Sequence, residues 1–271
     1  MKKTHVLIGS PVQQSPAILR EFLIALAEME KTSMSIDYIF MDDNTNESSS
    51  TLLADFKEKY GQVEIIKNKG SLNYRCDTYT HYWQEEIVWK VARMKDKIIE
   101  YARKNNYDYL FLIDSDLVAH PRTLVQLIKA GKEIISSIYW TCWQPGTIEM
   151  PQVWLEDQYS MYKKIPGEVI TDEEANQKMY EFFNQLQIPG IYEVGGLGAC
   201  TLISNKALRT GISFAKIKNL SFWGEDRHFC IRASALGLSL YVDTHYPAYH
   251  IYRESDVDGV ANFKKNINNN L

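Results

Sequence analysis

The feature that most constrains the fold is an alternation of short apolar runs with stretches whose apolar residues recur at helical spacing. Such short runs are typical of buried parallel strands. They lie at 4–9, 36–41, 63–66, 109–113 and 133–139. The helical stretches cover 16–31, 87–102 and 121–131. Alternating strands and helices with short connections predict an α/β fold, in which a mostly parallel central sheet carries helices on both faces.

The second half of the chain is less regular. A capping box at Thr171 and Glu174 predicts a helix that runs to about residue 186. Further strands are expected at 191–194, 200–204 and 238–242, and a further helix at 224–236. No repeat or linker interrupts the pattern. We therefore expect one compact domain over 1–262, followed by a frayed, asparagine-rich tail at 263–271.

Composition excludes several classes of protein. Of the 271 residues, 45% are apolar and 24% are charged, as in ordinary globular proteins. The 30 basic and 34 acidic residues give a net charge of −4, so nucleic acid is an unexpected partner. No apolar run is long enough to span a membrane or to act as a signal peptide. The four cysteines form no CxxC pair, so we expect a cytoplasmic protein with reduced thiols.

The strongest chemical signal is a pair of carboxylates after the most apolar run. Asp114 and Asp116 flank Ser115 directly after 109–113. Close carboxylates repel each other, so a cation beside them would relieve the repulsion. Their hard oxygen ligands suit Mg²⁺ or Mn²⁺, which are often bridged to phosphates. The alternative is a solvated strand end, because aspartate is common in turns.

Two weaker signals precede this pair. Asp42 and Asp43 end the run at 36–41, and they would accept hydrogen bonds from a nucleotide or close an Asx turn. Arg93 lies near the apolar stripe of the amphipathic stretch at 87–102. Its guanidinium would turn inward to phosphate or to Asp114, or would extend along the surface to solvent.

A third acidic group opens the helix expected at 224–236. Glu225 and Asp226 follow Trp223 and a glycine. Acids at this position either cap the helix, whose first turn favours negative charge, or act on a ligand there.

Glycines and histidines give further candidates. Gly196 and Gly198 belong to a glycine loop that would let backbone approach a ligand, although its spacing is not that of a dinucleotide motif. His245 and His250 follow the last expected strand, and either could complete a metal site begun by the two aspartates.

In this order, the segments resemble the GT-A-fold glycosyltransferases, especially the family 2-like group and its bacterial relatives of the mannan-polymerase type. The resemblance extends from about residue 4 to residue 252. The matching segments are 9–12, 41–44, 92–94, 109–116, 195–200 and 223–232, followed by Gly237, Asp243 and His250. It implies a Rossmann-like half at 1–118 that binds a nucleotide-sugar donor, and an acceptor and catalytic half at 119–262.

The resemblance also implies the residues that bind the donor. Pro11, Val12 and Asp43 would contact the nucleoside, with Asp42 the less favoured ligand of the base. Arg93 would lie near the diphosphate or the acids of the metal site, and Ser115 is also expected among the donor-binding residues.

The implied metal ligands are Asp114 and Asp116, which form a DxD motif with Ser115 between them, and His250. His245 is the second choice for the histidine. The metal would be Mn²⁺ or Mg²⁺.

The remaining implied roles concern the transferred sugar and the acceptor. Gly196 and Gly198 would line their pocket. Apart from the resemblance, the Trp223 ring would either stack on a sugar ring or pack in the core. Asp226 matches the general base of inverting members, and Glu225 is its neighbour.

The expected activity is metal-dependent transfer of a sugar from a UDP- or GDP-linked donor to the hydroxyl of a saccharide or another acceptor, with inversion. Residues 10–14 differ from the usual T-x-Y-N of family 2, which leaves retention open. The alternatives are a haloacid dehalogenase-like phosphohydrolase, which also uses a strand ending in D-x-D, and a non-catalytic nucleotide- or sugar-binding protein.

Overall fold

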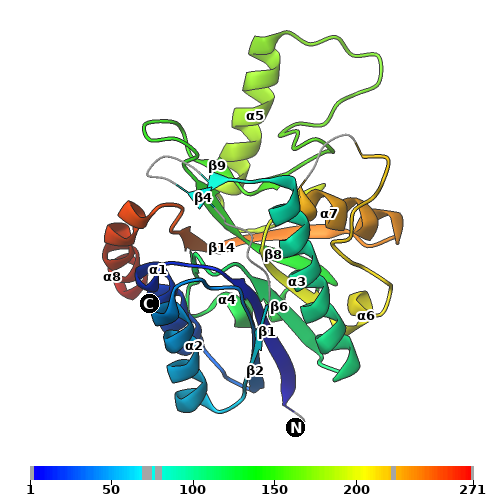
Figure 1. Ribbon diagram of the computed structural model, residues 1–271. Coiled ribbons are helices and arrows are strands. Elements are labelled where there is room, and N and C mark those ends of the chain that lie inside the picture. The colour runs from blue at the N-terminus through cyan, green and yellow to red at the C-terminus, as the bar shows by residue number, and fades with distance from the viewer. Residues whose placement is uncertain (1–2, 69–74, 77–80, 221–223, 270–271) are drawn as a thin grey trace.

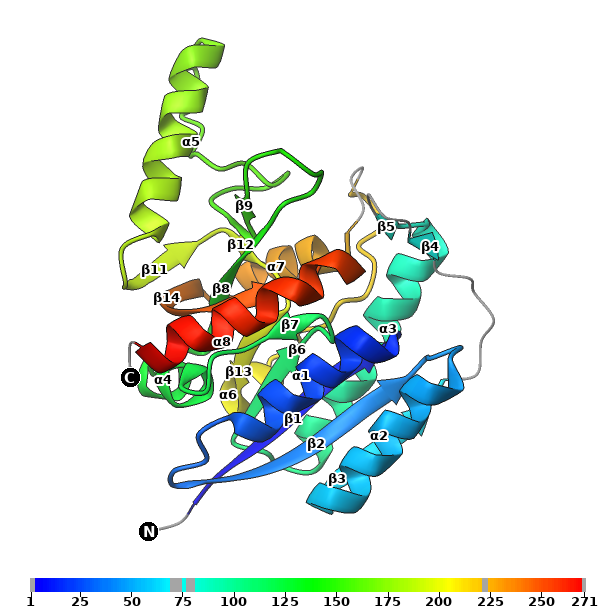
Figure 2. The same ribbon diagram turned by 90° about the vertical axis from the view of Figure 1, so that its left-hand side faces the viewer.

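The structure, a computed structural model, describes residues 3–68, 75–76, 81–220 and 224–269. Within them a ten-stranded curled sheet runs through the molecule between two layers of helices (Figures 1 and 2). Its main path is β11 (Ile191–Val194), β14 (Leu240–His250), β8 (Ile134–Thr141), β13 (Cys200–Ser204), β6 (Tyr109–Ile113), β1 (Thr4–Val12), β2 (Met34–Asp42) and β3 (Val63–Lys67).

The direction of the strands divides this sheet into two parts. β6, β1, β2 and β3 are parallel neighbours, as are β8 and β14. β13 is antiparallel to both β6 and β8, and β11 is antiparallel to β14. The predicted α/β fold with a mostly parallel central sheet is confirmed.

The other elements flank this sheet. The short strands are β4 (Arg75–Cys76), β5 (His81–Tyr82), β7 (Leu117–Val118), β9 (Met150–Pro151), β10 (Val153–Trp154) and β12 (Gly196–Leu197). The helices are α1 (Pro16–Glu28), α2 (Glu47–Tyr60), α3 (Glu85–Lys104), α4 (Thr123–Lys129), α5 (Asp172–Leu186), α6 (Asn205–Leu208), α7 (Glu225–Ala235), the 3-10 helix η1 (Glu254–Gly259) and α8 (Val260–Asn269).

β6 is apolar throughout because helices cover both faces of the sheet. Leu110 and Leu112 pack into the core under α3, α6 and α7. Phe111 and Ile113 point the other way, into the core under α1, α2 and α4. Side chains alternate between the two faces of a strand, so a strand buried on both faces needs an apolar residue at every position.

The helices match the sequence predictions with several differences, among them the short helices α6 and η1, which were not predicted. The capping box of α5 is present, with Thr171 and Glu174 bonding each other's backbone N–H. α1 ends at Glu28, earlier than expected. α2 was not predicted, because its first turn is rich in serine and its buried apolar residues are too few to show a helical period. The expected frayed tail is wrong for residues up to 269, which belong to α8, where Ile267 is buried.

Candidate active site

The site begins where β6 ends, at the carboxyl edge of the parallel strands. The chain turns after Ile113 and enters β7, which pairs antiparallel with the end of β14. Leu117 lies opposite His250, and the backbone N–H of Ile251 donates to the carbonyl of Asp116 at 2.9 Å. This pairing brings His250 to Asp116 from a distant part of the sequence.

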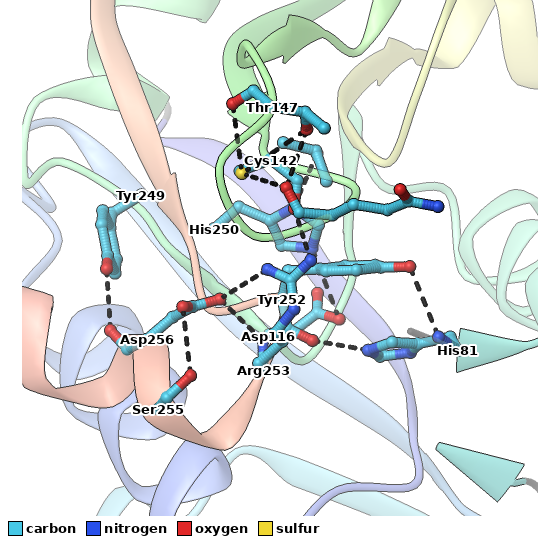
Figure 3. A network of polar contacts seen from close by, with 12 residues as sticks. His81, Asp116, Cys142, Thr147, Tyr249, His250, Tyr252, Arg253, Ser255 and Asp256 are labelled. Carbon is cyan, nitrogen blue, oxygen red and sulfur yellow. Dashed lines mark hydrogen bonds and ion pairs between the residues drawn. The ribbon is translucent and has the colours of Figure 1, made fainter. Parts of the chain in front are cut away.

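Asp116 and His250 face each other (Figure 3). The distance from His250 Nε2 to Asp116 Oδ2 is 3.7 Å. On the other side of the ring, Nδ1 shares a 2.8 Å hydrogen bond with the Thr141 hydroxyl, which fixes the orientation of the imidazole. Burial alone would raise the pKa of Asp116, but the His250 imidazole and then His81 hold that pKa below its ordinary value.

His245 does not reach this pair. Its Nδ1 lies 3.1 Å from Asp243 Oδ1, and its backbone N–H donates to the same oxygen at 2.9 Å. Of the two histidines considered from the sequence, the structure therefore brings His250 to the DxD segment.

A buried lysine, Lys95 of α3, joins the other acids of the site. Its side chain is 0% exposed. Its Nζ lies 3.0 Å from Glu225 Oε1, 3.2 Å from Asp226 Oδ1 and 3.5 Å from Asp114 Oδ1. Asp114 keeps 34% of its side chain exposed and Asp226 keeps 28%, so both are also partly accessible to solvent.

One ammonium group among three carboxylates leaves an excess of negative charge in a desolvated place. Burial raises the pKa of Asp226 to about 7, against the opposing effect of Lys95, and the charges of Glu225 and Asp114 raise it further. Burial likewise raises the pKa of Asp114 to about 6. Burial opposes the charge of Lys95, but the three carboxylates together hold its pKa well above the ordinary value. Shifted carboxyl groups of this kind gather at active sites.

Of the two orientations considered for Arg93, the structure shows the one at the surface, and its contact with a diphosphate stays a prediction. Arg93 is exposed on α3, whereas the neighbouring Met94 and Lys95 are buried. On this helix the cation directed at Asp114 is the shorter side chain of Lys95, two positions further along. Sequence periodicity placed Arg93 near the apolar stripe, but it did not identify Lys95 as the buried cation of this helix.

A second buried lysine of α3 occupies the candidate nucleoside site. Lys90 Nζ lies 2.6 Å from Asp43 Oδ2, and Asn68 Nδ2 donates to Asp43 Oδ1 at 3.0 Å. Both charged side chains are at least nine-tenths buried. The Asp43 carboxylate is thus held by two polar side chains, and neither Lys90 nor Asn68 was identified from the sequence.

Asp42 has a local role instead. Its Oδ1 accepts from the Asn44 backbone N–H at 3.1 Å and the Asn44 side chain at 2.8 Å, and the Ser50 hydroxyl donates to its Oδ2 at 2.9 Å. These bonds close an Asx turn and tie it to α2. Pro11 and Val12 end β1 beside β2, and the Asp43 backbone N–H donates to the Val12 carbonyl at 2.8 Å.

The glycine loop packs closely against aromatic rings. A Cβ on Gly196 would lie 1.9 Å from the Trp154 ring, which crosses it from the paired strand β10. A Cβ on Gly198 would lie 2.5 Å from the Tyr139 hydroxyl. The missing side chains therefore serve internal packing, and contact of this loop with a ligand stays a prediction.

We expect Gly196→Ala to lower Tm by roughly 5 °C, because overpacking a filled site costs about 1–3 kcal/mol. In a Trp154→Phe background, where the ring is smaller, the same substitution should lower Tm by less. Differential scanning calorimetry of the four proteins measures both losses, and equal losses would contradict a clash with Trp154.

The remaining two candidates from the sequence are Ser115 and Trp223. Ser115 is buried in the turn between the two aspartates. Trp223 lies outside the described residues.

The chemistry of the residues allows a divalent cation beside Asp116. Its carboxylate and the His250 imidazole are adjacent, and the buried Oδ1 of Asp114 accepts no hydrogen bond from a described residue. In the described part of the chain, no group of three or more His, Cys, Asp or Glu side chains is arranged as a metal site. Mg²⁺ commonly takes one or two protein ligands and completes its shell with phosphate oxygens and water. Asp116 and His250 fit that incomplete kind of site.

Comparison with known proteins identifies the family. The model of the family described as "Glycosyltransferase family 25, N-terminal domain" matches residues 3–142, about half of the 271 residues. The chain belongs to this glycosyltransferase family. The resemblance seen in the sequence is thus confirmed at the level of a glycosyltransferase family.

Solved structures show the same fold. The structure of residues 1–349 of S. aureus TarS matches with a TM-score of 0.52 and 12% identity over 91% of this glycosyltransferase, and the match covers 60% of that TarS chain. A second TarS structure matches with the same TM-score, identity and coverage of this chain, and the match covers 36% of that TarS chain. The glycosyltransferase thus spans less than two thirds of either TarS chain. No curated protein sequence matches it.

None of its described helices is long and apolar enough to cross a membrane.

Proposed function

We propose that this glycosyltransferase moves a sugar from a UDP- or GDP-linked donor to a hydroxyl acceptor, with a divalent metal and with inversion at the anomeric carbon. One observation carries the proposal. At the carboxyl end of β6, the Asp116–His250 pair stands beside Asp114, which shares Lys95 with Asp226. A site for the diphosphate and a basic carboxylate are thereby next to each other.

In this proposal Asp116 and His250 hold Mn²⁺ or Mg²⁺, with Asp114 as the neighbouring acid. Such an ion, when bound, offsets the negative charge of the departing nucleoside diphosphate. Pro11, Val12 and Asp43, fixed by Lys90 and Asn68, bind the nucleoside at the ends of β1 and β2. The carboxyl edge of parallel strands is where α/β sheets bind such ligands.

Asp226 is the proposed general base. Lys95 engages its Oδ1, and among the described residues we find no hydrogen bond to its Oδ2. The acceptor hydroxyl gives its proton to Asp226 as its oxygen bonds to the anomeric carbon. The bond from that carbon to the diphosphate breaks, and the nucleotide leaves with the electron pair. A pKa of about 7 suits a base that acts near neutral pH.

The relation to mannan-polymerase-type enzymes, the cytoplasmic location and the division of the chain at residue 118 remain predictions. The family assignment favours glycosyl transfer over a haloacid dehalogenase-like phosphohydrolase. A direct test has to distinguish glycosyl transfer from the remaining alternative, a non-catalytic binding protein.

The test is a thermal-shift panel with UDP, GDP, CDP and dTDP, each with Mn²⁺ and with EDTA. We expect UDP or GDP with Mn²⁺ to raise Tm by about 5–10 °C when the nucleotide is at 100 times its Kd. Equal shifts in EDTA would contradict metal dependence, and no shift with any nucleotide would contradict the donor class. Binding without turnover of sugar nucleotides would indicate the non-catalytic alternative, and phosphate release from phosphomonoesters would indicate a phosphohydrolase.

A further inference from the structure

We propose that Lys95 is the positioning residue of the catalytic base: its ammonium group holds Asp226 and Glu225 beside Asp114 and so joins the acceptor side of the site to the donor side. This inference rests on the proposed function, because it takes Asp226 as the base.

The contacts of Lys95 span three separate segments. Lys95 belongs to α3, Asp114 follows β6, and Glu225 and Asp226 open α7. The Nζ donates to Glu225 Oε1 at 3.0 Å and to Asp226 Oδ1 at 3.2 Å, and it pairs with Asp114 Oδ1 at 3.5 Å. A single side chain therefore ties the start of α7 to the end of β6.

Lys95 acts on Asp226 without contacting substrate. Its side chain is 0% exposed, whereas Asp226 keeps 28% of its side chain exposed. The Phe214 ring lies 5.2 Å from the ammonium nitrogen, and the Phe214 backbone N–H donates to Asp96 at 2.6 Å. The ammonium is thus enclosed by protein, and its effect on the reaction passes through the carboxylates.

Helix geometry alone would not fix these acids. Consecutive helical residues point about 100° apart, so Glu225 and Asp226 leave α7 in different directions. Lys95 nevertheless reaches one oxygen of each. Without this shared cation, the repulsion among three neighbouring carboxylates would separate them. The position of Asp226 therefore depends on Lys95.

The experiment compares Lys95→Met, Lys95→Arg and Lys97→Met with the wild-type protein. Lys97 is an exposed lysine of the same helix and serves as the matched control. Turnover is followed as UDP or GDP released from UDP-glucose or GDP-mannose, and affinity as the binding of UDP or GDP with Mn²⁺. We expect Lys95→Met to lower kcat by about 100-fold, the usual effect of a small misplacement, with nucleotide affinity nearly unchanged. Lys95→Arg should recover part of kcat, and Lys97→Met should behave as wild type.

A second measurement keeps the proposal falsifiable if Lys95→Met folds poorly. Unfolding of Lys95→Met, Asp226→Asn and the double variant forms a double-mutant cycle. Removing the lysine should lower Tm by about 10 °C when the buried carboxylates are intact, and by clearly less in the Asp226→Asn background. Equal losses in both backgrounds, or a loss of nucleotide affinity as large as the loss of kcat, would overturn the role of Lys95. A wild-type protein that binds neither nucleotide would instead overturn the proposed function, while the cycle would still show whether Lys95 holds Asp226.

Discussion

Replacing Asp226 by asparagine is expected to lower kcat by about 10²–10⁴-fold, the usual contribution of a general base. Asparagine keeps the size of the side chain and removes its basicity. Because Asp116, His250 and Asp43 are untouched, the affinity for UDP or GDP with Mn²⁺ should persist. Steady-state turnover and calorimetric binding on the same preparation measure the two quantities. Turnover close to that of the wild type would refute the base, and a product that keeps the anomeric configuration of the donor would refute inversion.

The pH dependence gives an independent check on the same residue. A base acts in its deprotonated form, so the wild-type rate should rise as the pH passes through about 7, where burial places the pKa of Asp226. The residual activity of Asp226→Asn should lack that rise. A wild-type profile that is flat between pH 6 and 8, a range of about one unit on either side of that pKa, would contradict the assignment.

Stability should depend on pH through the same group. The pKa of Asp226 is higher in the folded chain than in an unfolded one, where it is about 4. The folded state therefore keeps a proton that the unfolded state has lost, so this group's stabilising contribution is present at low pH and is lost as the pH rises through about 7. Asp226→Asn should raise Tm by several degrees at pH 8 and change it little at pH 4.

Asp116→Asn is expected to abolish most of the metal-dependent nucleotide affinity. Changes in the groups that merely orient a metal ligand cost about 10–100-fold in metal affinity, so loss of a proposed ligand should cost at least about 100-fold. Isothermal titration of UDP or GDP with and without Mn²⁺ measures the effect. Unchanged affinity in both conditions would contradict the metal site.

His245 provides a matched control for the proposed metal-binding role of His250. His250→Ala should weaken Mn²⁺-dependent binding, because its Nε2 lies 3.7 Å from Asp116. His245→Ala should leave binding unchanged, because that ring pairs with Asp243. The opposite pattern would transfer the metal role to His245.

Much of the fold follows from local patterns that a sequence displays directly. The run at 109–113 predicted a strand buried on both faces, and β6 occupies those residues with alternate side chains in two cores. The capping box at Thr171 predicted the start of α5 for a similar reason, since both partners lie within one helical turn. Polar helices such as α2 were missed because their buried apolar residues are too few to show a period.

The candidate site also combines features that the sequence predicts with features that only the tertiary structure shows. By itself the sequence determined that Asp114 and Asp116 follow a buried strand and that Glu225 and Asp226 open a helix, because these positions depend on neighbours in the chain. Only the tertiary structure decided which cationic side chain contacts these acids. Arg93 and Lys95 are both charges on an amphipathic helix, and periodicity does not report what the facing elements carry. Burial of a lysine is favourable only where carboxylates from other segments compensate its charge, and folding alone brings Asp114 and α7 to Lys95.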